Sequence, residues 1–242
     1  MQNAAEGTTP THVASEMVRD RSPAIMVRLD PSLRSRQPTR LFRKRTPLLS
    51  DGQSATWNCP AEATYWPGDR SLTKLLPELS LSSEHYFDEV VFQRLLSGQG
   101  LPYPGGKAVL LEFYQIDFPP MIQHRLFDLR TRGLLPVIAH PERYQCLWRS
   151  PEILEKLVDS GSAALLDIAS LIGKYGRKTQ ECAELLLERG LYHAACSDAH
   201  RPSDVAEVAR GIERLRQLYG PEEVTFMFRE GPEQLLLGVL PE

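Results

Sequence analysis

Short apolar runs alternate with amphipathic stretches from about residue 81 onward, and this alternation predicts the elements of an α/β fold. Runs of strand length, most of them aliphatic and bounded by a turn or a charge, cover residues 108–113, 134–139, 163–168, 191–196 and 224–228. Between them, apolar residues recur at near-helical spacing and predict helices over residues 86–96, 119–132, 151–159, 178–188 and 203–218. Predicted strands and helices therefore alternate from about residue 81 onward.

The predicted helices end at glycines, which are common helix stops because they adopt left-handed backbone without strain: Gly98, Gly133, Gly161, Gly190 and Gly220. Repeated strand–helix units imply parallel strands joined by right-handed crossovers. The spacing of about 25–30 residues per unit is typical of a barrel. We therefore expect an α/β barrel, or a part of one.

The first 81 residues have a different character. Residues 1–80 contain 11 Lys and Arg against 8 Asp and Glu, together with 8 of the 19 prolines. The basic stretch from Arg19 to Arg45 shows neither helical nor alternating periodicity. Such a segment buries little apolar surface to offset the entropy lost on ordering. We therefore expect an irregular, Pro/Arg-rich segment over residues 1–81 and an α/β domain over residues 82–242.

Composition and charge exclude several classes of protein. The formal net charge of −3 gives no reason to expect a nucleic-acid or anionic-membrane partner. No apolar run approaches the roughly 20 residues that span a bilayer, and no signal-peptide pattern opens the chain. The four cysteines show no close pairing and no zinc-ribbon spacing. These features predict a cytoplasmic protein with reduced cysteines and no membrane insertion, and they leave the oligomeric state open.

Ionisable side chains stand where three of the predicted strands end. Glu112 lies near the end of one strand, His140 follows the next at once, and Asp198 and His200 follow a third. Because parallel strands bring their carboxyl ends to one edge, these side chains should meet at the same rim. Asp198 and His200 are two residues apart, so in extended backbone they would point the same way.

Glu84, just before the first helical run, adds a further carboxylate. Together these residues offer oxygen and nitrogen ligands without a thiolate, which suits manganese, zinc, iron or magnesium better than a structural zinc site. Each residue alone has a simpler explanation: Glu112 as a half-buried edge carboxylate, Asp198 as a residue that starts a helix. The set is harder to explain that way, because buried strands rarely end in ionisable groups without a partner.

Four motifs carry a resemblance to a known family: E-F at 112–113, A-H-P-E-R-Y at 139–144, A-S-L-I-G-K-Y-G at 169–176 and S-D-A-H at 197–200. In this order and spacing they resemble the PHP-domain phosphoesterases, in particular the bacterial tyrosine-protein phosphatases of capsule and exopolysaccharide gene clusters, the CpsB/YwqE type. The resemblance covers about residues 82–240. Pairing of the A-H-P-E-R and G-K-Y-G segments favours this branch over other PHP phosphoesterases.

The resemblance implies a distorted (β/α)₇ barrel with up to three metal ions, usually manganese, at the strand carboxyl ends. It implies hydrolysis of phosphotyrosine on a bacterial tyrosine kinase that regulates polysaccharide export. In such a reaction the metal ions lower the pKa of a water molecule and neutralise charge on the phosphoryl oxygens. Carried over by position, the metal ligands would be Glu84, Glu112, His140, Asp198 and His200.

Arg143, within the A-H-P-E-R motif, is the candidate catalytic residue. Its guanidinium could bind the phosphate through two parallel hydrogen bonds, a geometry that lysine cannot reproduce. The alternative is a structural ion pair with Glu142 or a neighbouring carboxylate. A cysteine-phosphatase mechanism with Cys196 and Arg201 is less suitable, because no glycine-rich turn lies between them to present backbone amides to phosphate. We interpret Cys196 as a small buried residue.

One part of the family pattern is missing. The D-x-H-x-H motif of the first strand and a T-P-H-H-like segment are absent from residues 1–81, although about the expected number of residues precedes Glu84. We hypothesise a shifted reading frame or gene decay, which the coding DNA upstream of codon 82 would test. With fewer ligands, fewer ions than three are expected. A catalytically impaired PHP-like remnant with a binding or regulatory role is therefore the alternative to a working phosphatase.

Overall fold

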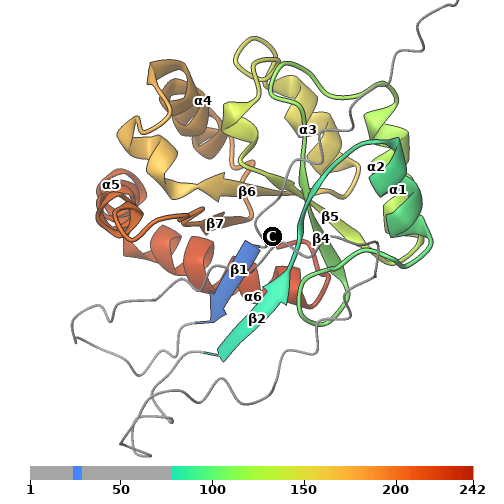
Figure 1. Cartoon of the computed structure of the whole chain (residues 1–242). Helices are drawn as coiled ribbons and strands as arrows, with labels where there is room; N and C mark the ends of the chain where they lie inside the picture. The colour runs from blue at the N-terminus through green and yellow to red at the C-terminus, as the bar shows by residue number, and fades with distance from the viewer. Residues whose placement is uncertain (1–23, 29–77, 242) are drawn as a thin grey trace, which may run out of the picture.

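The computed structural model describes residues 24–28 and 78–241, and its centre is a parallel five-stranded sheet in the order β3-β4-β5-β6-β7 (Figure 1). Every neighbouring pair in this sheet is parallel. The strands are β3 (Glu84–Tyr86), β4 (Ala108–Glu112), β5 (Leu135–Ala139), β6 (Ala163–Asp167) and β7 (Ala194–Cys196). Consecutive strands are thus neighbours in space, and their carboxyl ends form one rim.

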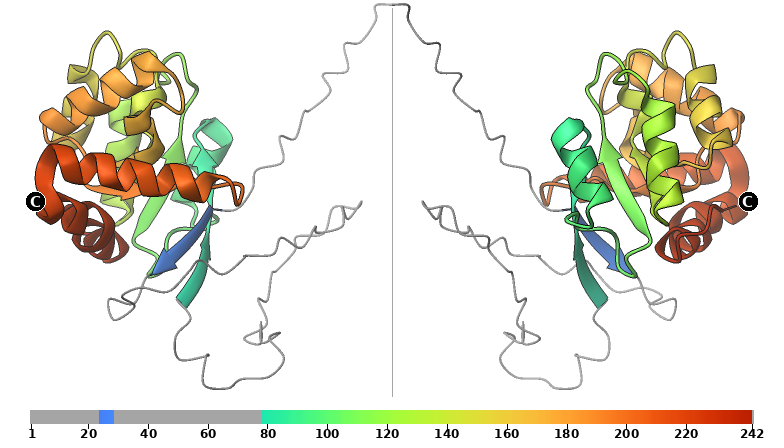
Figure 2. Two further views of the ribbon diagram at one scale, coloured as in Figure 1. Left: turned by 90° about the vertical axis from the view of Figure 1, so that its left-hand side faces the viewer. Right: turned by 90° about the vertical axis from the view of Figure 1, so that its right-hand side faces the viewer.

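Helices follow the strands, and all but the last cover one side of the sheet, as Figures 1 and 2 show. They are α1 (Glu89–Leu96), α2 (Ile122–Thr131), α3 (Glu152–Asp159), α4 (Arg177–Glu188), α5 (Asp204–Thr225) and α6 (Gly231–Leu236). Short helical turns η2 (Pro141–Arg143) and η3 (Ile168–Ile172) follow β5 and β6, and η4 (Phe226–Glu230) links α5 to α6. The predicted alternation of parallel strands and helices is confirmed.

Alternate residues of the strands face two separate apolar clusters. One sheet face packs on α1 to α5 and η4 through Val109, Leu111, Ile138, Ala164, Leu166 and Ala195. The opposite face, here called the alanine-rich face, consists of Ala108, Leu110, Leu135, Val137, Ala139, Ala163, Leu165 and Ala194. The residues that cover the alanine-rich face are Tyr103, Leu235, Leu236 and Leu240. The strands are buried on both sides, as their continuous apolar runs predict.

Two strands form a separate antiparallel pair: β1 (Ala24–Arg28) and β2 (Glu78–Ser82), with Ala24 opposite Ser82. Both strands start within residues 1–81, which we expected to be irregular. This part of the chain therefore contains at least one regular strand pair. The rest of the expectation for residues 1–81 falls on residues 1–23 and 29–77, outside the described part of the chain, and it stays a prediction.

Three elements differ from the sequence-based expectation. The strand predicted over residues 191–196 begins only at Ala194. Tyr86, predicted to start a helix, belongs to β3, and α1 begins at Glu89 because the Asp88 carboxylate accepts a hydrogen bond from the Val91 amide at 2.8 Å. The predicted strand 224–228 is helical instead. Its β-favouring residues are overridden by packing: Val224, Met227 and Phe228 recur at helical spacing and join the helix-side cluster.

The predicted break at Gly220 is confirmed. Gly220 has φ 91° and ψ 174°, which interrupts α5 directly before Pro221. Within the described residues, no helix is long and apolar enough to cross a membrane.

Candidate functional site

Three predicted ligands converge at the carboxyl-terminal rim of the sheet: Glu84, Glu112 and His140. Each offers one ligand atom, and these atoms all lie within 4.8 Å of one another. His140 Nε2 lies 3.2 Å from a Glu84 carboxylate oxygen and 3.8 Å from one of Glu112. Two carboxylates and an imidazole at this separation can bind one divalent cation.

The sheet register places the two carboxylates together. Glu84 is paired with Leu110 and Tyr86 with Glu112, so Glu84 and Glu112 lie on the same face of neighbouring strands. His140 follows β5 directly and has φ 32°, in the left-handed region that non-glycine residues rarely adopt. Such backbone strain is found preferentially at functional sites, where surrounding structure maintains it.

The His140 imidazole is buried, and it is held by Glu84. Burial lowers the pKa of His140, but the hydrogen bond to Glu84 and the negative charge of Glu142 outweigh burial and the Arg143 charge, so its pKa is raised. The Nδ1 atom is buried and has no hydrogen-bond partner among the described residues. The nitrogen that faces the two carboxylates is Nε2, and an imidazole nitrogen beside two carboxylates fits a site that binds a cation.

Asp198 and His200 reach the same rim but lie outside the three-ligand cluster. We expected extended backbone between Asp198 and His200, but Asp198 has φ 40°, in the left-handed region. The two side chains therefore do not simply point the same way: His200 Nδ1 lies 2.9 Å from the Asp198 carbonyl oxygen and 3.7 Å from its Oδ1. The His200 side chain is 57% exposed, so it is accessible from solvent.

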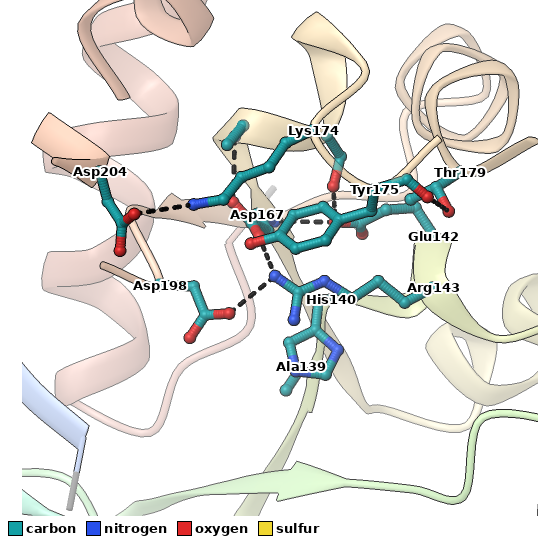
Figure 3. Close-up of polar contacts among 12 residues, drawn as sticks. Ala139, His140, Glu142, Arg143, Asp167, Lys174, Tyr175, Thr179, Asp198 and Asp204 are labelled. Carbon is teal, nitrogen blue, oxygen red and sulfur yellow. Dashed lines mark hydrogen bonds and ion pairs between the residues drawn. The ribbon is translucent and has the colours of Figure 1, made fainter. Parts of the chain in front are cut away.

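Arg143 joins two carboxylates at the rim, as Figure 3 shows. Its Nη2 donates to Asp167 Oδ2 and, at 2.7 Å, to Asp198 Oδ2. The Tyr175 ring stacks on the guanidinium, with 3.8 Å between Cζ and the ring centroid. The ion-pair alternative therefore describes the arrangement, with Asp167 and Asp198 rather than Glu142 as partners.

Glu142 has a different role from its neighbour Arg143. Its fully buried carboxylate accepts hydrogen bonds from the Asp167 amide at 3.1 Å, the Ser170 hydroxyl at 2.8 Å and the Tyr192 hydroxyl at 2.9 Å. Burial, followed by the negative charge of Asp167, raises the pKa of Glu142. The side chain ties η2 to the end of β6 and so fixes the loop that carries Arg143.

Asp167 is the rim residue that sequence reasoning missed. It ends β6 as Glu112 ends β4, and it is fully buried. The sequence contained the signal, an acidic residue within the apolar run 163–168, by the same argument that identified Glu112 and His140. Its partner Arg143 lies 24 residues earlier in the chain, so the ion pair itself was not apparent.

Cys196 does not have the properties of a phosphatase nucleophile. Burial, together with the nearby Asp167 and Asp198 carboxylates, raises the pKa of its thiol well above the ordinary value. Thiol nucleophiles react as thiolates, which positive surroundings favour and which buried, acidic surroundings disfavour. Cys196 is therefore a structural residue next to the rim, although it is half-buried rather than buried as the sequence indicated.

Comparisons with known proteins identify the family to which the chain is similar. The family described as "Capsular polysaccharide synthesis, CpsB/CapC" matches residues 71–237. Tyrosine-protein phosphatase YwqE of Bacillus subtilis is 32% identical over 151 residues, which are 60% of this chain and 58% of the relative. Tyrosine-protein phosphatase CpsB of Streptococcus pneumoniae is 22% identical over 168 residues, 67% of this chain and 69% of the relative.

A solved structure is also similar. It comes from a study of YwqE from Bacillus subtilis and CpsB from Streptococcus pneumoniae, described as metal-dependent tyrosine phosphatases. The TM-score is 0.59 at 29% sequence identity, over 66% of this chain and 65% of the other. The matched part of this chain thus spans somewhat less than two thirds of YwqE and of the solved chain.

Proposed function

The chain belongs to the CpsB/CapC family of capsular polysaccharide synthesis proteins, and on this premise we propose that it is a metal-dependent protein-tyrosine phosphatase. The observation that carries the proposal is the convergence of Glu84, Glu112 and His140 at the rim, within one cation-sized cluster. Arg143 lies beside this cluster, so a cation site and a phosphate-binding cation are adjacent. Both groups can stabilise the negative charge that develops on the phosphoryl oxygens during metal-dependent hydrolysis of a phosphomonoester.

The metal ligands in this proposal are Glu84, Glu112 and His140, joined by Asp198 and His200. Asp198 Oδ2 binds Arg143, which leaves Oδ1, on the His200 side, as a ligand atom. Manganese is the first choice, with zinc, iron or magnesium as alternatives, because the donors are oxygen and nitrogen atoms. A bound ion would supply Lewis-acid charge beside the phosphoryl group and increase the acidity of water there.

The chain's own residues would bind and orient the substrate. Arg143 keeps its positive charge at any working pH and retains hydrogen-bond donors beyond those used for Asp167 and Asp198. Two parallel hydrogen bonds from its terminal nitrogens are not available while Nη2 holds both carboxylates. We therefore assign Arg143 the role of a fixed cation that donates to the phosphate from Nη1.

Fold, substrate and location complete the proposal. The five parallel strands support an incomplete PHP-type (β/α)₇ barrel. Names of the relatives support phosphotyrosine on a protein as the substrate, and the family resemblance supports a bacterial tyrosine kinase of capsule or exopolysaccharide synthesis as the partner. The reduced cysteines Cys146, Cys182 and Cys196 support a cytoplasmic location.

The second candidate is a PHP-like protein that binds a metal ion or a phosphoprotein without efficient turnover. The observation that favours it is the split of the predicted ligands: three form the cluster, while Asp198 and His200 lie outside it. Loss of ligand geometry removes both metal affinity and the alignment of the attacking water.

The deciding experiment measures Mn²⁺ binding by calorimetry and hydrolysis of a phosphotyrosine peptide, for the full chain and its His140→Ala variant. His124→Ala, which removes an exposed histidine of α2, is the matched control. A working phosphatase binds Mn²⁺ and turns over the peptide, and only His140→Ala abolishes both.

The other outcomes discriminate between the candidates. Mn²⁺ binding without turnover favours the binding protein. Turnover that survives His140→Ala comes from a contaminant or from another site and contradicts the proposal. If neither Mn²⁺ binding nor turnover is found, the metal-dependent function is wrong.

A further inference from the structure

The Arg143 guanidinium is held by two residues that the proposed reaction does not use directly, Asp167 and Tyr175. Asp167 is fully buried and accepts a hydrogen bond from Nη2. Tyr175 covers the flat side of the guanidinium, with its ring centroid 3.8 Å from Cζ. In Figure 3 the ring lies over the guanidinium and Asp167 lies at its Nη2 end. One contact therefore fixes the position of the group, and the other fixes its plane.

The Tyr175 phenol lies next to the same carboxylate. Burial, followed by a hydrogen bond to Asp167, raises the pKa of Tyr175, so the phenol keeps its proton. Asp167 is anchored at its other oxygen, Oδ1, which accepts from the Ala169 amide at 3.0 Å. Arg143 therefore contacts both Tyr175 and Asp167, and Asp167 is anchored to the backbone of η3.

Arg143 still has donors to offer. Both of its ion pairs use Nη2, and its Nε is buried without a hydrogen-bond partner among the described residues. The other terminal nitrogen, Nη1, is therefore the one whose donors remain for a ligand. A guanidinium of fixed plane with unpaired donors is preorganised for an oxyanion.

We propose that Tyr175 is a positioning residue for phosphate binding, acting through the plane of the Arg143 guanidinium. The inference rests on the proposed function, in which Arg143 is the phosphate-binding cation. Without the ring, the guanidinium can rotate away from the orientation that binds phosphate. Phosphate binding must then fix that orientation and carries the conformational entropy cost of doing so. Fixing a binding group in advance raises affinity by removing that entropic cost.

The test uses calorimetry of inorganic phosphate binding to the full chain in the presence of Mn²⁺. Replacing the ring, Tyr175→Leu, should weaken phosphate binding by roughly 3- to 30-fold, the range of a cation–π contact. Mn²⁺ affinity should not change, because Tyr175 is outside the cluster of Glu84, Glu112 and His140. Tyr175→Phe keeps the ring and should bind phosphate nearly as the wild type does.

Two controls separate positioning from a general structural effect. Tyr114→Leu removes an exposed tyrosine of the loop after β4 and should leave phosphate affinity unchanged. Arg143→Lys removes the planar group itself, so adding Tyr175→Leu to that variant should cause no further loss. A purely structural role of Tyr175 would weaken binding equally in both backgrounds.

The results identify which idea fails. If the wild type binds phosphate and Tyr175→Leu binds it equally well, or if the two substitutions act additively, the positioning role is wrong and the proposed function stands. If the wild type with Mn²⁺ does not bind phosphate, the proposed function and this inference fail together. If Tyr175→Leu does not unfold cooperatively, Tyr175→Met, a flexible side chain without a ring, replaces it in every comparison.

Discussion

The Glu142 carboxylate accepts a hydrogen bond from the backbone amide of Asp167, which lies 25 residues later in the chain, at 3.1 Å. This bond joins the A-H-P-E-R segment to the end of β6. It sets the position of Asp167 relative to Arg143, and the ion pair between those two residues depends on it. The buried acid of the motif is thus a part of the framework behind the rim.

Replacing Glu142 should show this role. Glu142→Ala leaves the Asp167 amide and the Ser170 and Tyr192 hydroxyls without their acceptor, and it should lower the free energy of unfolding by about 3 kcal/mol or more. Glu142→Gln keeps an acceptor oxygen and removes a buried charge, so it should cost much less. Urea denaturation of both variants measures the difference, and equal losses would contradict the hydrogen-bonding role.

Tyr144 ties together the two strands that deliver Glu112 and His140. Its hydroxyl accepts from the Phe113 amide at 3.1 Å and donates to the Ala139 carbonyl at 2.8 Å. Tyr144→Phe should therefore cost about 2–3 kcal/mol of stability and weaken Mn²⁺ binding roughly 10-fold or more. The exposed Tyr114→Phe is the control, measured by denaturation and calorimetry. Unchanged Mn²⁺ affinity in Tyr144→Phe would show that the ligands keep their positions without this link.

Gly211 permits the close packing of α5 on η3. A Cβ atom at this position would lie 2.5 Å from the Ile168 carbonyl oxygen, a backbone atom that cannot move aside. Gly211→Ala should gain about 1 kcal/mol in helix propensity and lose more than that through overpacking. A net loss of about 1–2 kcal/mol in urea denaturation is expected, while Gln217→Ala, on an exposed part of α5, changes little. A stabilised Gly211→Ala variant would contradict this packing.

The buried His193 should make the folded state less stable as the pH is lowered. Burial lowers its pKa to about 4, against an ordinary value of 6.5 in the unfolded chain. Above pH 6.5 both states are neutral and the residue has no effect. As the pH falls from 6.5 to 4, only the unfolded state takes up the proton, so the folded state loses up to roughly 3 kcal/mol of relative stability.

The comparison for His193 is its asparagine variant. His193→Asn keeps an acceptor for the Ala164 amide, which donates to His193 Nδ1 at 3.1 Å, but it does not titrate. The free energy of unfolding, measured from pH 7 to pH 4, should therefore fall less steeply in the variant. Parallel curves would mean that His193 is not the group responsible.

The sequence predicted the main strands because each is a compact apolar run, such as residues 163–167, that a glycine or a charge terminates. It misassigned residues 224–228, where aromatic and β-branched residues favoured a strand. There the neighbouring Gly231 lies so close to β7 that a Cβ atom would be 1.9 Å from the His193 carbonyl oxygen. That packing is long-range, and no local propensity contains it.

The rim could be predicted only in part. Glu112 and His140 followed from the rule that parallel strands bring their carboxyl ends together, and Asp167 would have followed from the same rule. The contacts of Asp198 could not be predicted in this way. Its left-handed backbone, φ 40°, decides that one carboxylate oxygen meets Arg143, 55 residues earlier, rather than the three-ligand cluster.

The cover of the alanine-rich face has a consequence for how the protein is made. That face begins at Ala108 but is covered by Leu235, Leu236 and Leu240, so its cluster joins segments more than a hundred residues apart. During synthesis on the ribosome, the strands emerge well before the leucines that shield them. The nascent sheet therefore exposes one bare side for most of its translation, and chaperones have their greatest opportunity to bind it then.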